Sequence, residues 1–397
     1  MTEKKNNYRW IILAVVVLCG INNVYFQYQM SPIADKIIAQ YGLTRTQYSS
    51  LFTAPMAPAV FISLICGIVV DRFGAKRAIS IALVVAAIGI WGRLFTTNYS
   101  LLYFFMFIPG FACTFINANV AKILGEWFDV KWTSICVGIY LASSAIGQAL
   151  ATSTTPMLPS VNTAYLIAAI YATVMIVVWI VFYRSNAPKR EPDAQTEKTD
   201  ESVLSKLRDV LKNRNVMITA LCIMCAFGSL MNLTTFMPMI LQSKGMSSVG
   251  AGTRASLISL GQLTGCLLGP SLAARLGSTR KVIRGFSIAG ALMIVAIALL
   301  QGGALLSVAL FLAGASIGSM MPMFMSLPIK LKGIGVEKAG TAGGTLSTFQ
   351  LLGAVLLPSY VISPLSGGSW TALLLIGAVI CALVFVLSLF LTAEADA

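Results

Sequence analysis

The residues of this sequence that could do chemistry are side-chain amides, and one arginine, that interrupt long apolar stretches. An amide both donates and accepts hydrogen bonds, and a guanidinium binds an oxyanion through a planar fork of donors. The candidates are Asn22, Asn23, Asn117, Asn119, Gln148, Asn232, Gln262, Gln350 and Arg254. A buried amide costs free energy without a partner, so pairing between helices explains each one on its own. Together they could also line a polar cavity that binds a small solute.

Arg254 favours an anionic solute. It lies about five residues into the apolar run 249–272, which places it roughly 10 Å from the middle of a spanning helix. No carboxylate lies near it in the sequence, so an anion from solution could pair with it. Arg93 and Lys122 lie nearer the ends of their runs, and we expect them to extend to lipid headgroups.

The pattern contains no enzyme chemistry. The sequence has no His, no nucleophile–base pair and no phosphate-binding loop. Cys222 and Cys225 form a C-x-x-C pair, but no second pair completes a zinc shell, so we interpret them as small residues on one helix face. We therefore expect no catalysis, no metal and no cofactor.

The 14 Asp and Glu residues all fall in tails, loops or the ends of apolar runs. Proton relays in membranes use ionisable groups at mid-depth, and none is present. If the chain carries a solute across a membrane, it would do so by exchange, by uniport, or by symport in which the proton travels with the solute.

The elements that must position these side chains are membrane helices. The composition is 57% apolar and only 11% charged, against about a quarter charged in a soluble protein. Runs of about 20 apolar residues match a bilayer core of about 30 Å. Twelve runs are predicted, at residues 9–31, 48–70, 78–97, 101–123, 134–156, 162–183, 216–241, 249–272, 282–301, 305–328, 339–361 and 370–392.

The net charge of +14 reports membrane topology. Of 28 Lys and Arg, 23 fall in the N-terminal tail, four short loops and a central linker that we place on one side. Positive loops stay in the cytoplasm, so both termini are predicted to be cytoplasmic, in a multi-pass protein of a bacterial inner membrane. The excess of cations therefore does not indicate a nucleic-acid partner.

The chain divides into two similar parts. Residues 184–215 are polar and are interpreted as a cytoplasmic linker, with 203–211 as a short surface helix, between a six-helix half at 1–183 and another at 216–397. Gly138 and Gly147 are matched about 206 positions later by Gly344 and Gly353. Residues 270–281 likewise echo residues 67–78 about 203 positions on, with Ala274 in place of Asp71. Parallel repeats of this kind are typical of transporters.

One loop carries a specific motif. Its spacing is G-x-x-x-D-R-x-G-x-x-R, formed by Gly67, Asp71, Arg72, Gly74 and Arg77. It resembles the loop between helices 2 and 3 of the major facilitator superfamily. The resemblance implies an all-α fold of twelve transmembrane helices in two pseudo-symmetric halves. It also implies that this loop packs against the other half in one of two alternating states and acts as a conformational gate.

The branch of that family is indicated by smaller signals. Span 5 lacks the proline motif of drug–proton antiporters, and Phe61 and Thr264 stand where nitrate porters place arginines. The stretch 121–140 resembles cyanate and organic-anion carriers. We therefore expect a monomeric secondary transporter of a small organic anion by alternating access, with substrate and lipid as its partners. The alternatives are an efflux pump for drugs or other apolar compounds and a non-transporting membrane receptor or scaffold.

Overall fold

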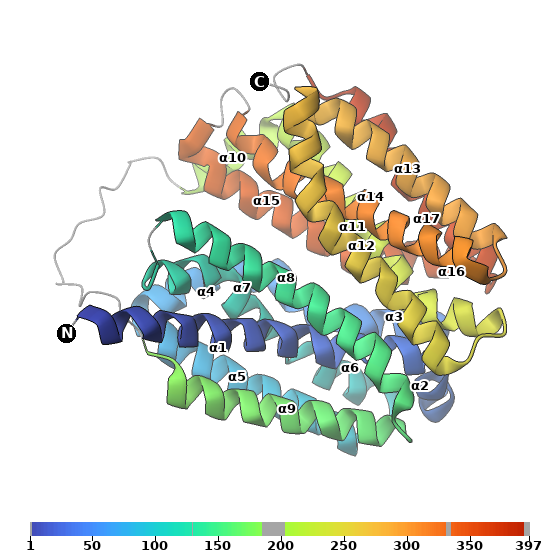
Figure 1. Cartoon of the computed structure of the whole chain (residues 1–397), viewed down its shortest axis with the longest axis horizontal. Coiled ribbons are helices and arrows are strands. Elements are labelled where there is room, and N and C mark those ends of the chain that lie inside the picture. The colour runs from blue at the N-terminus through green and yellow to red at the C-terminus, as the bar shows by residue number, and fades with distance from the viewer. Residues whose placement is uncertain (1, 129, 185–202, 331–334, 393–397) are drawn as a thin grey trace.

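The structure is a computed structural model that describes residues 2–128, 130–184, 203–330 and 335–392, and all regular structure in these ranges is helical (Figure 1). This confirms the predicted all-α membrane fold. The helices are α1 (Thr2–Tyr28), α2 (Ala34–Tyr41), α3 (Arg45–Thr53), α4 (Ala57–Phe73), α5 (Ala75–Gly92), α6 (Tyr99–Phe107), α7 (Gly110–Gly125), α8 (Val130–Thr154), α9 (Val161–Phe182), α10 (Val203–Lys212), α11 (Arg214–Ser243), α12 (Ser248–Leu276), α13 (Thr279–Leu299), α14 (Gly303–Lys330), α15 (Gly335–Leu356), α16 (Ser363–Leu365) and α17 (Trp370–Leu389).

The helices form two groups (Figure 1). We call α1–α9 the N-terminal half and α11–α17 the C-terminal half. The predicted short helix of the linker is present as α10, which packs against α11 and α15. The start of α1, the end of α17 and α10 lie at one end of the bundle, which we call the terminal end, and the opposite end is the distal end.

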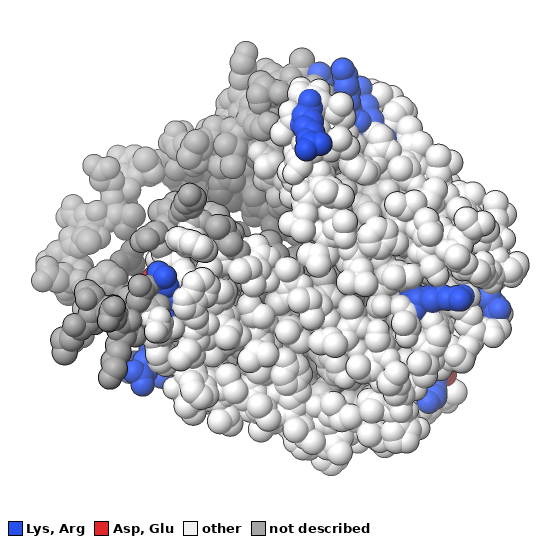
Figure 2. Space-filling view, in the orientation of Figure 1, with Lys and Arg blue, Asp and Glu red and all other residues white. Residues whose placement is uncertain are grey.

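An apolar surface separates the two ends. Eleven helical stretches in the described residues are long and apolar enough to cross a membrane. The Lys and Arg side chains visible in Figure 2 gather toward the two ends, and the face between them is almost free of charge. Large apolar side chains such as Ile81, Leu267 and Val379 are exposed on that surface. This is the surface of a multi-pass membrane protein.

Several predicted spans are interrupted where proline removes a backbone donor. The run 101–123 is divided at Ile108 and Pro109 into α6 and α7. The run 48–70 combines α3, a 3-10 turn containing Pro55, and α4, and the run 339–361 ends in a π-helical turn containing Pro358. Each of these runs is therefore built from more than one helical element.

The internal repeat appears as the same close helix crossing in each half. A Cβ on Gly147 of α8 would lie 2.9 Å from the Ile21 carbonyl oxygen of α1. A Cβ on Gly353 of α15 would lie 2.2 Å from the Met224 carbonyl oxygen of α11. Residues 147 and 353 differ by 206 positions, and residues 21 and 224 by 203. Both halves therefore use glycine to bring equivalent helix backbones together, as expected for small residues in membrane helices.

The C-terminal half contains a longer glycine contact between α12 and α14. Cβ atoms on Gly261 and Gly265 would each lie 2.0 Å from a carbonyl oxygen of α14, those of Phe311 and Ala315. A Cβ on Gly314 would lie 2.0 Å from the Ile258 carbonyl oxygen of α12. Spacing by four residues places these glycines on one helix face, so the two backbones touch directly.

This contact predicts a large effect of one methyl group. Gly265→Ala should lower the free energy of unfolding by about 2 kcal/mol, because a backbone oxygen cannot move aside as a side chain can. Thermal unfolding of the purified protein in detergent measures the effect. Gly285→Ala in α13 is the control, since nothing lies within 4 Å of its Cβ position. Equal melting temperatures for the two variants would contradict this account of the α12–α14 contact.

Candidate functional site

Polar groups from three helices meet inside the N-terminal half. The buried Tyr140 hydroxyl of α8 donates a hydrogen bond to Oδ1 of Asn117 on α7. The Asn23 side chain of α1 interacts with the same hydroxyl, but its Nδ2 makes no hydrogen bond of ordinary geometry among the described residues. Gly20, one turn earlier, allows this approach, because a Cβ there would lie 2.8 Å from the Tyr140 ring. We call Asn23, Asn117 and Tyr140 the amide–phenol cluster.

The cluster has an open side and a spare donor. Asn117 is exposed, whereas Tyr140 and Asn23 are buried. An unpaired amide donor beside a phenol is costly inside a protein unless a solute or water completes it. The arrangement can therefore hydrogen-bond a hydroxyl or carboxylate oxygen that enters from the open side.

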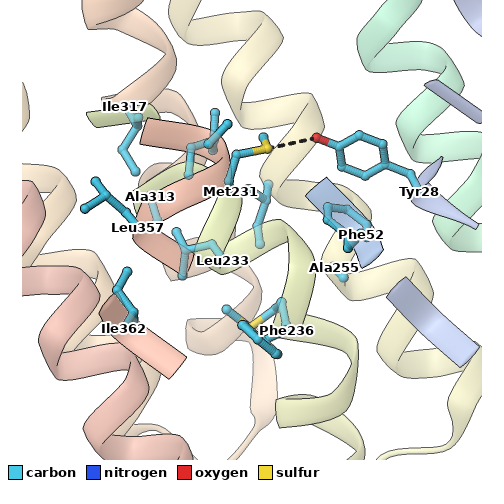
Figure 3. Packing of buried hydrophobic residues seen from close by; sticks show 14 of the residues in the cluster. Tyr28, Phe52, Met231, Leu233, Phe236, Ala255, Ala313, Ile317, Leu357 and Ile362 are labelled. Carbon is cyan, nitrogen blue, oxygen red and sulfur yellow. Dashed lines mark hydrogen bonds between the residues drawn. The ribbon is translucent and has the colours of Figure 1, made fainter. Parts of the chain in front are cut away.

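A second polar group lies where the two halves meet. The Tyr28 hydroxyl of α1 donates to Sδ of Met231 on α11 at 3.6 Å (Figure 3). It also interacts with the side chains of Gln148 and Thr234. Ser31 Oγ donates to the Thr234 carbonyl oxygen at 2.6 Å. Residues 28 and 231, and residues 31 and 234, are each 203 positions apart, so the pseudo-twofold axis passes between them.

Further contacts join the halves at the distal end. Arg45 of α3 lies 3.7 Å above the ring centre of Trp370 and donates to the Gly368 carbonyl oxygen. Partial burial lowers the pKa of the Arg45 guanidinium, and the Asp35 carboxylate opposes that shift. Further hydrogen bonds between the halves include Ser49 with Ser359 at 2.9 Å, Thr46 with Ser363 at 3.3 Å, and Gln242 with the Pro32 carbonyl oxygen at 3.2 Å. We call this set of contacts the distal seal.

At the terminal end the helices of the two halves diverge (Figure 1). Here Gly74, with φ of +82°, joins α4 to α5 in a conformation that favours glycine. Arg72 and Arg77 of the predicted gate motif are exposed. The Asp71 side chain and the surroundings of Gly67 lie outside the described residues. The loop motif is therefore at the end of the molecule where the halves are apart.

The remaining predicted residues lie elsewhere. Asn119 Nδ2 donates to the Phe115 carbonyl oxygen of its own helix at 2.9 Å. Asn232 Nδ2 donates to the Leu373 carbonyl oxygen at 3.4 Å, which ties α11 to α17. Arg254 is half-buried at the distal end, with Nη1 3.3 Å from Sδ of Met246. Asn22 is buried, and Gln262 and Gln350 are half-buried. Of the predicted set, the described contacts bring Asn23 and Asn117 together and place Gln148 on the axis.

A family model described as Major Facilitator Superfamily matches residues 11–358. The chain belongs to this superfamily. The uncharacterized transporter YycB of Bacillus subtilis (strain 168) is 24% identical over 90% of this chain and 87% of its own length. The hexuronate transporter of Escherichia coli (strain K12) is 23% identical over 50% of this chain and 45% of its own. The galacturonate transporter of Dickeya chrysanthemi is 24% identical, over 48% of this chain and 56% of its own.

Among solved structures, a mutant of the nucleoside transporter NupG superposes with a TM-score of 0.79 at 15% identity. The match covers 96% of this chain and 99% of that one, and it supports the twelve-helix fold. The protein is thus a membrane transporter of the superfamily and not an enzyme, as the sequence predicts.

A hydropathy pattern does not identify the two tyrosines of these polar groups as candidate site residues. Tyr28 and Tyr140 count as apolar in a hydropathy pattern, although each hydroxyl interacts with the predicted amides. The prediction for Arg93 is wrong, because this side chain is fully buried and does not extend to headgroups. After α5 a 3-10 turn over Arg93–Phe95 directs its guanidinium onto the Phe26 carbonyl oxygen of α1. A cation near a span end can thus turn inward when a neighbouring helix offers carbonyl groups.

The distal seal predicts that a larger residue at position 252 prevents the distal end of the molecule from closing. A Cβ on Gly252 of α12 would lie 2.2 Å from the Thr152 carbonyl oxygen of α8. Gly252→Ala should hold the distal ends apart and reduce transport at least tenfold in a folded protein. The measurement is labelling of Ser359→Cys, in a background without the native cysteines, by a membrane-impermeant maleimide.

Labelling of Ser359→Cys should rise in the Gly252→Ala variant, since Ser359 is buried in the seal. Gly250→Ala is the control, because its Cβ would meet only the Ser247 hydroxyl, at 3.1 Å. Wild-type labelling and transport in Gly252→Ala would mean that the seal does not depend on this crossing.

Proposed function

We propose that this protein is a secondary transporter that moves a small organic anion by alternating access, with the amide–phenol cluster among its substrate contacts. The observation that carries the proposal is the meeting of Asn23, Asn117 and Tyr140 from three helices, with one face open and one donor unpaired. Neutral donors of this kind suit the hydroxyl and carboxylate oxygens of a sugar acid. Gln148 and Tyr28 extend the polar surface toward the axis.

An anionic substrate is supported by charge and by relatives. No Asp or Glu is buried among the side chains that the structure describes, so none of them repels a carboxylate from inside. Relatives at 23% and 24% identity bear the names hexuronate and galacturonate transporter. The scarcity of interior carboxylates favours exchange, uniport, or symport in which the substrate itself carries the proton.

The arrangement of the halves supports a specific state and topology. The distal seal is closed and the terminal helix ends diverge, which is the geometry of a carrier open at the terminal end. We place that end in the cytoplasm of a bacterial cell, with the chain acting as a monomer in the inner membrane. Residues 1–183 and 216–397 would move as two bodies joined by the linker 184–215. The loop Gly67–Arg77 would contact the other half when the terminal end closes.

Binding to the cluster should depend on one hydroxyl. Tyr140→Phe should weaken the apparent affinity for galacturonate about tenfold, a loss of about 1.4 kcal/mol, because it removes the hydroxyl beside Asn23 and Asn117. Thermal-shift titration of the purified protein measures this affinity, with neutral galactose and a cationic dye as comparison ligands. Tyr171→Phe is the matched control, since its hydroxyl bonds the Leu18 carbonyl oxygen of α1, at a different place.

A response to cationic dyes with none to galacturonate, glucuronate or 4-hydroxybenzoate would replace the anion proposal by efflux of apolar compounds. If the Tyr140→Phe variant binds the anion with wild-type affinity, the substrate site does not include the amide–phenol cluster.

Arg254 offers a separate test of anion entry. Its guanidinium touches only a sulfur among the contacts described for it, so its fork of donors is available when the distal end opens. Arg254→Lys should raise the Michaelis constant of uptake about tenfold while the maximal rate stays similar, because lysine cannot form the bidentate pair. Uptake into proteoliposomes is the measurement. Wild-type kinetics in both Arg254→Lys and Arg254→Gln would show that the side chain only reaches headgroups.

A further inference from the structure

Arg93 is a charged group whose surroundings do not balance its charge. The side chain has no exposed surface. Nη1 donates to the Phe26 carbonyl oxygen at 3.1 Å and to Sδ of Met106 at 3.7 Å, and Nε donates to the Ile90 carbonyl oxygen at 3.3 Å. Nη2 is buried without a partner among the described residues, and no described carboxylate pairs with the guanidinium. A buried cation is strongly destabilising unless an opposite charge or a full set of acceptors surrounds it.

Lys244, a half-buried cation at the distal end of the C-terminal half, provides a comparison. Nζ of Lys244, just after α11, donates to the carbonyl oxygens of Ile297 and Leu300 at 2.6 Å each. Both oxygens belong to the C-terminal end of α13, where carbonyl groups lack helical partners and the helix dipole favours a cation. Lys244 is therefore satisfied by the protein alone, and Arg93 is not.

Two buried phenols in this region lack a hydrogen-bond partner in the described part of the chain. The Arg93 guanidinium carbon lies 4.6 Å from the ring centre of Tyr165 on α9, and the Tyr165 hydroxyl is buried and unpaired among the described residues. Tyr165 interacts electrostatically with Tyr48 of α3, whose hydroxyl is also buried and unpaired in the described part of the chain. Phenol faces offset part of a cation's charge, but their hydroxyl hydrogens still need an acceptor.

We infer that Arg93, Tyr165 and Tyr48 form a binding site for a small monovalent anion of the halide type. Such an ion accepts hydrogen bonds from all sides and supplies the missing negative charge. All three side chains are fully buried, so an organic acid would force the helices apart, and the ion we infer is monoatomic. The site is therefore separate from the amide–phenol cluster, and it does not depend on which solute is transported.

The site is also connected to the distal seal. Tyr48 packs against Phe236 of the C-terminal half, with ring centres 6.3 Å apart. The next residue, Ser49, bonds Ser359 across the halves. Separation of the halves at the distal end would expose Tyr48 and give the ion a path out. The anion would thus be held while the seal is closed, and it would stabilise that state because it binds the closed form better.

The test is a thermal-unfolding titration of the full-length purified protein with sodium bromide, in which sodium methanesulfonate keeps the ionic strength constant. Wild type should show a saturable rise in melting temperature. Tyr165→Phe and Tyr48→Phe each remove one donor and keep the ring, and each should weaken the apparent bromide affinity about tenfold. Tyr183→Phe is the matched control, just after α9. Its hydroxyl is equally buried and unpaired in the described part of the chain, but it lies at the other end of that helix.

Two further readouts make the result decisive. Bromide should give an anomalous scattering peak within hydrogen-bonding distance of Nη2 of Arg93 in crystals, and bromide should slow labelling of the Ser359→Cys reporter. An equal melting temperature in bromide and methanesulfonate, an unchanged response in Tyr165→Phe, or no anomalous peak at Arg93 would each overturn the inference. Water alone would then fill the site.

Discussion

The interior of a membrane offers no water to polar groups, and this constraint decides how the helices of this protein are joined. Backbone groups are satisfied within each helix, so polar contacts between helices depend on side chains, several of which donate to a carbonyl oxygen of a neighbouring helix. Gln27 donates to the Phe52 carbonyl oxygen at 2.8 Å, and Ser229 donates to that of Gly377 at 3.0 Å. Where no donor is available, glycine lets two backbones touch, as between α12 and α14. Among the described contacts inside the molecule, Arg93 is a fully buried cation held by carbonyl oxygens and a sulfur and not by a carboxylate.

The two kinds of contact differ in where they predominate. Within a half, glycine crossings bring whole stretches of backbone together, and such contacts cannot slide without a clash. Between the halves there is one described crossing of this kind, Gly252 of α12 against α8, but the distal seal consists mostly of single hydrogen bonds and one cation–π pair. Each such hydrogen bond contributes about 1 kcal/mol net, so the joint is weaker than the bodies it connects. That contrast is what alternating access requires of the fold.

The membrane spans, the all-α fold and the repeat could be predicted from sequence because hydropathy and glycine spacing act locally along a helix. Which amides meet depends on the rotation of each helix about its axis. That rotation is set by packing against other helices and not by the sequence of the helix alone. Asn117 and Asn119 are two residues apart on α7, but one pairs with Tyr140 while the other bonds its own helix. Breaks at Pro55 and Pro109 shift that rotation further. The prediction for Arg93 fails for the same reason, since its direction follows from a 3-10 turn that hydropathy does not indicate.

The contacts on the pseudo-twofold axis have a consequence for how such a chain can diverge. In a symmetric dimer of identical six-helix units, a residue on the axis faces its own copy, so it must be compatible with itself. Fusion of the two units into one polypeptide removes that requirement. Here a tyrosine faces a methionine, and a serine hydroxyl donates to the carbonyl oxygen of a threonine. Two different residues can face each other on the axis only in a fused chain, because there each copy of an axial position can mutate independently of the other.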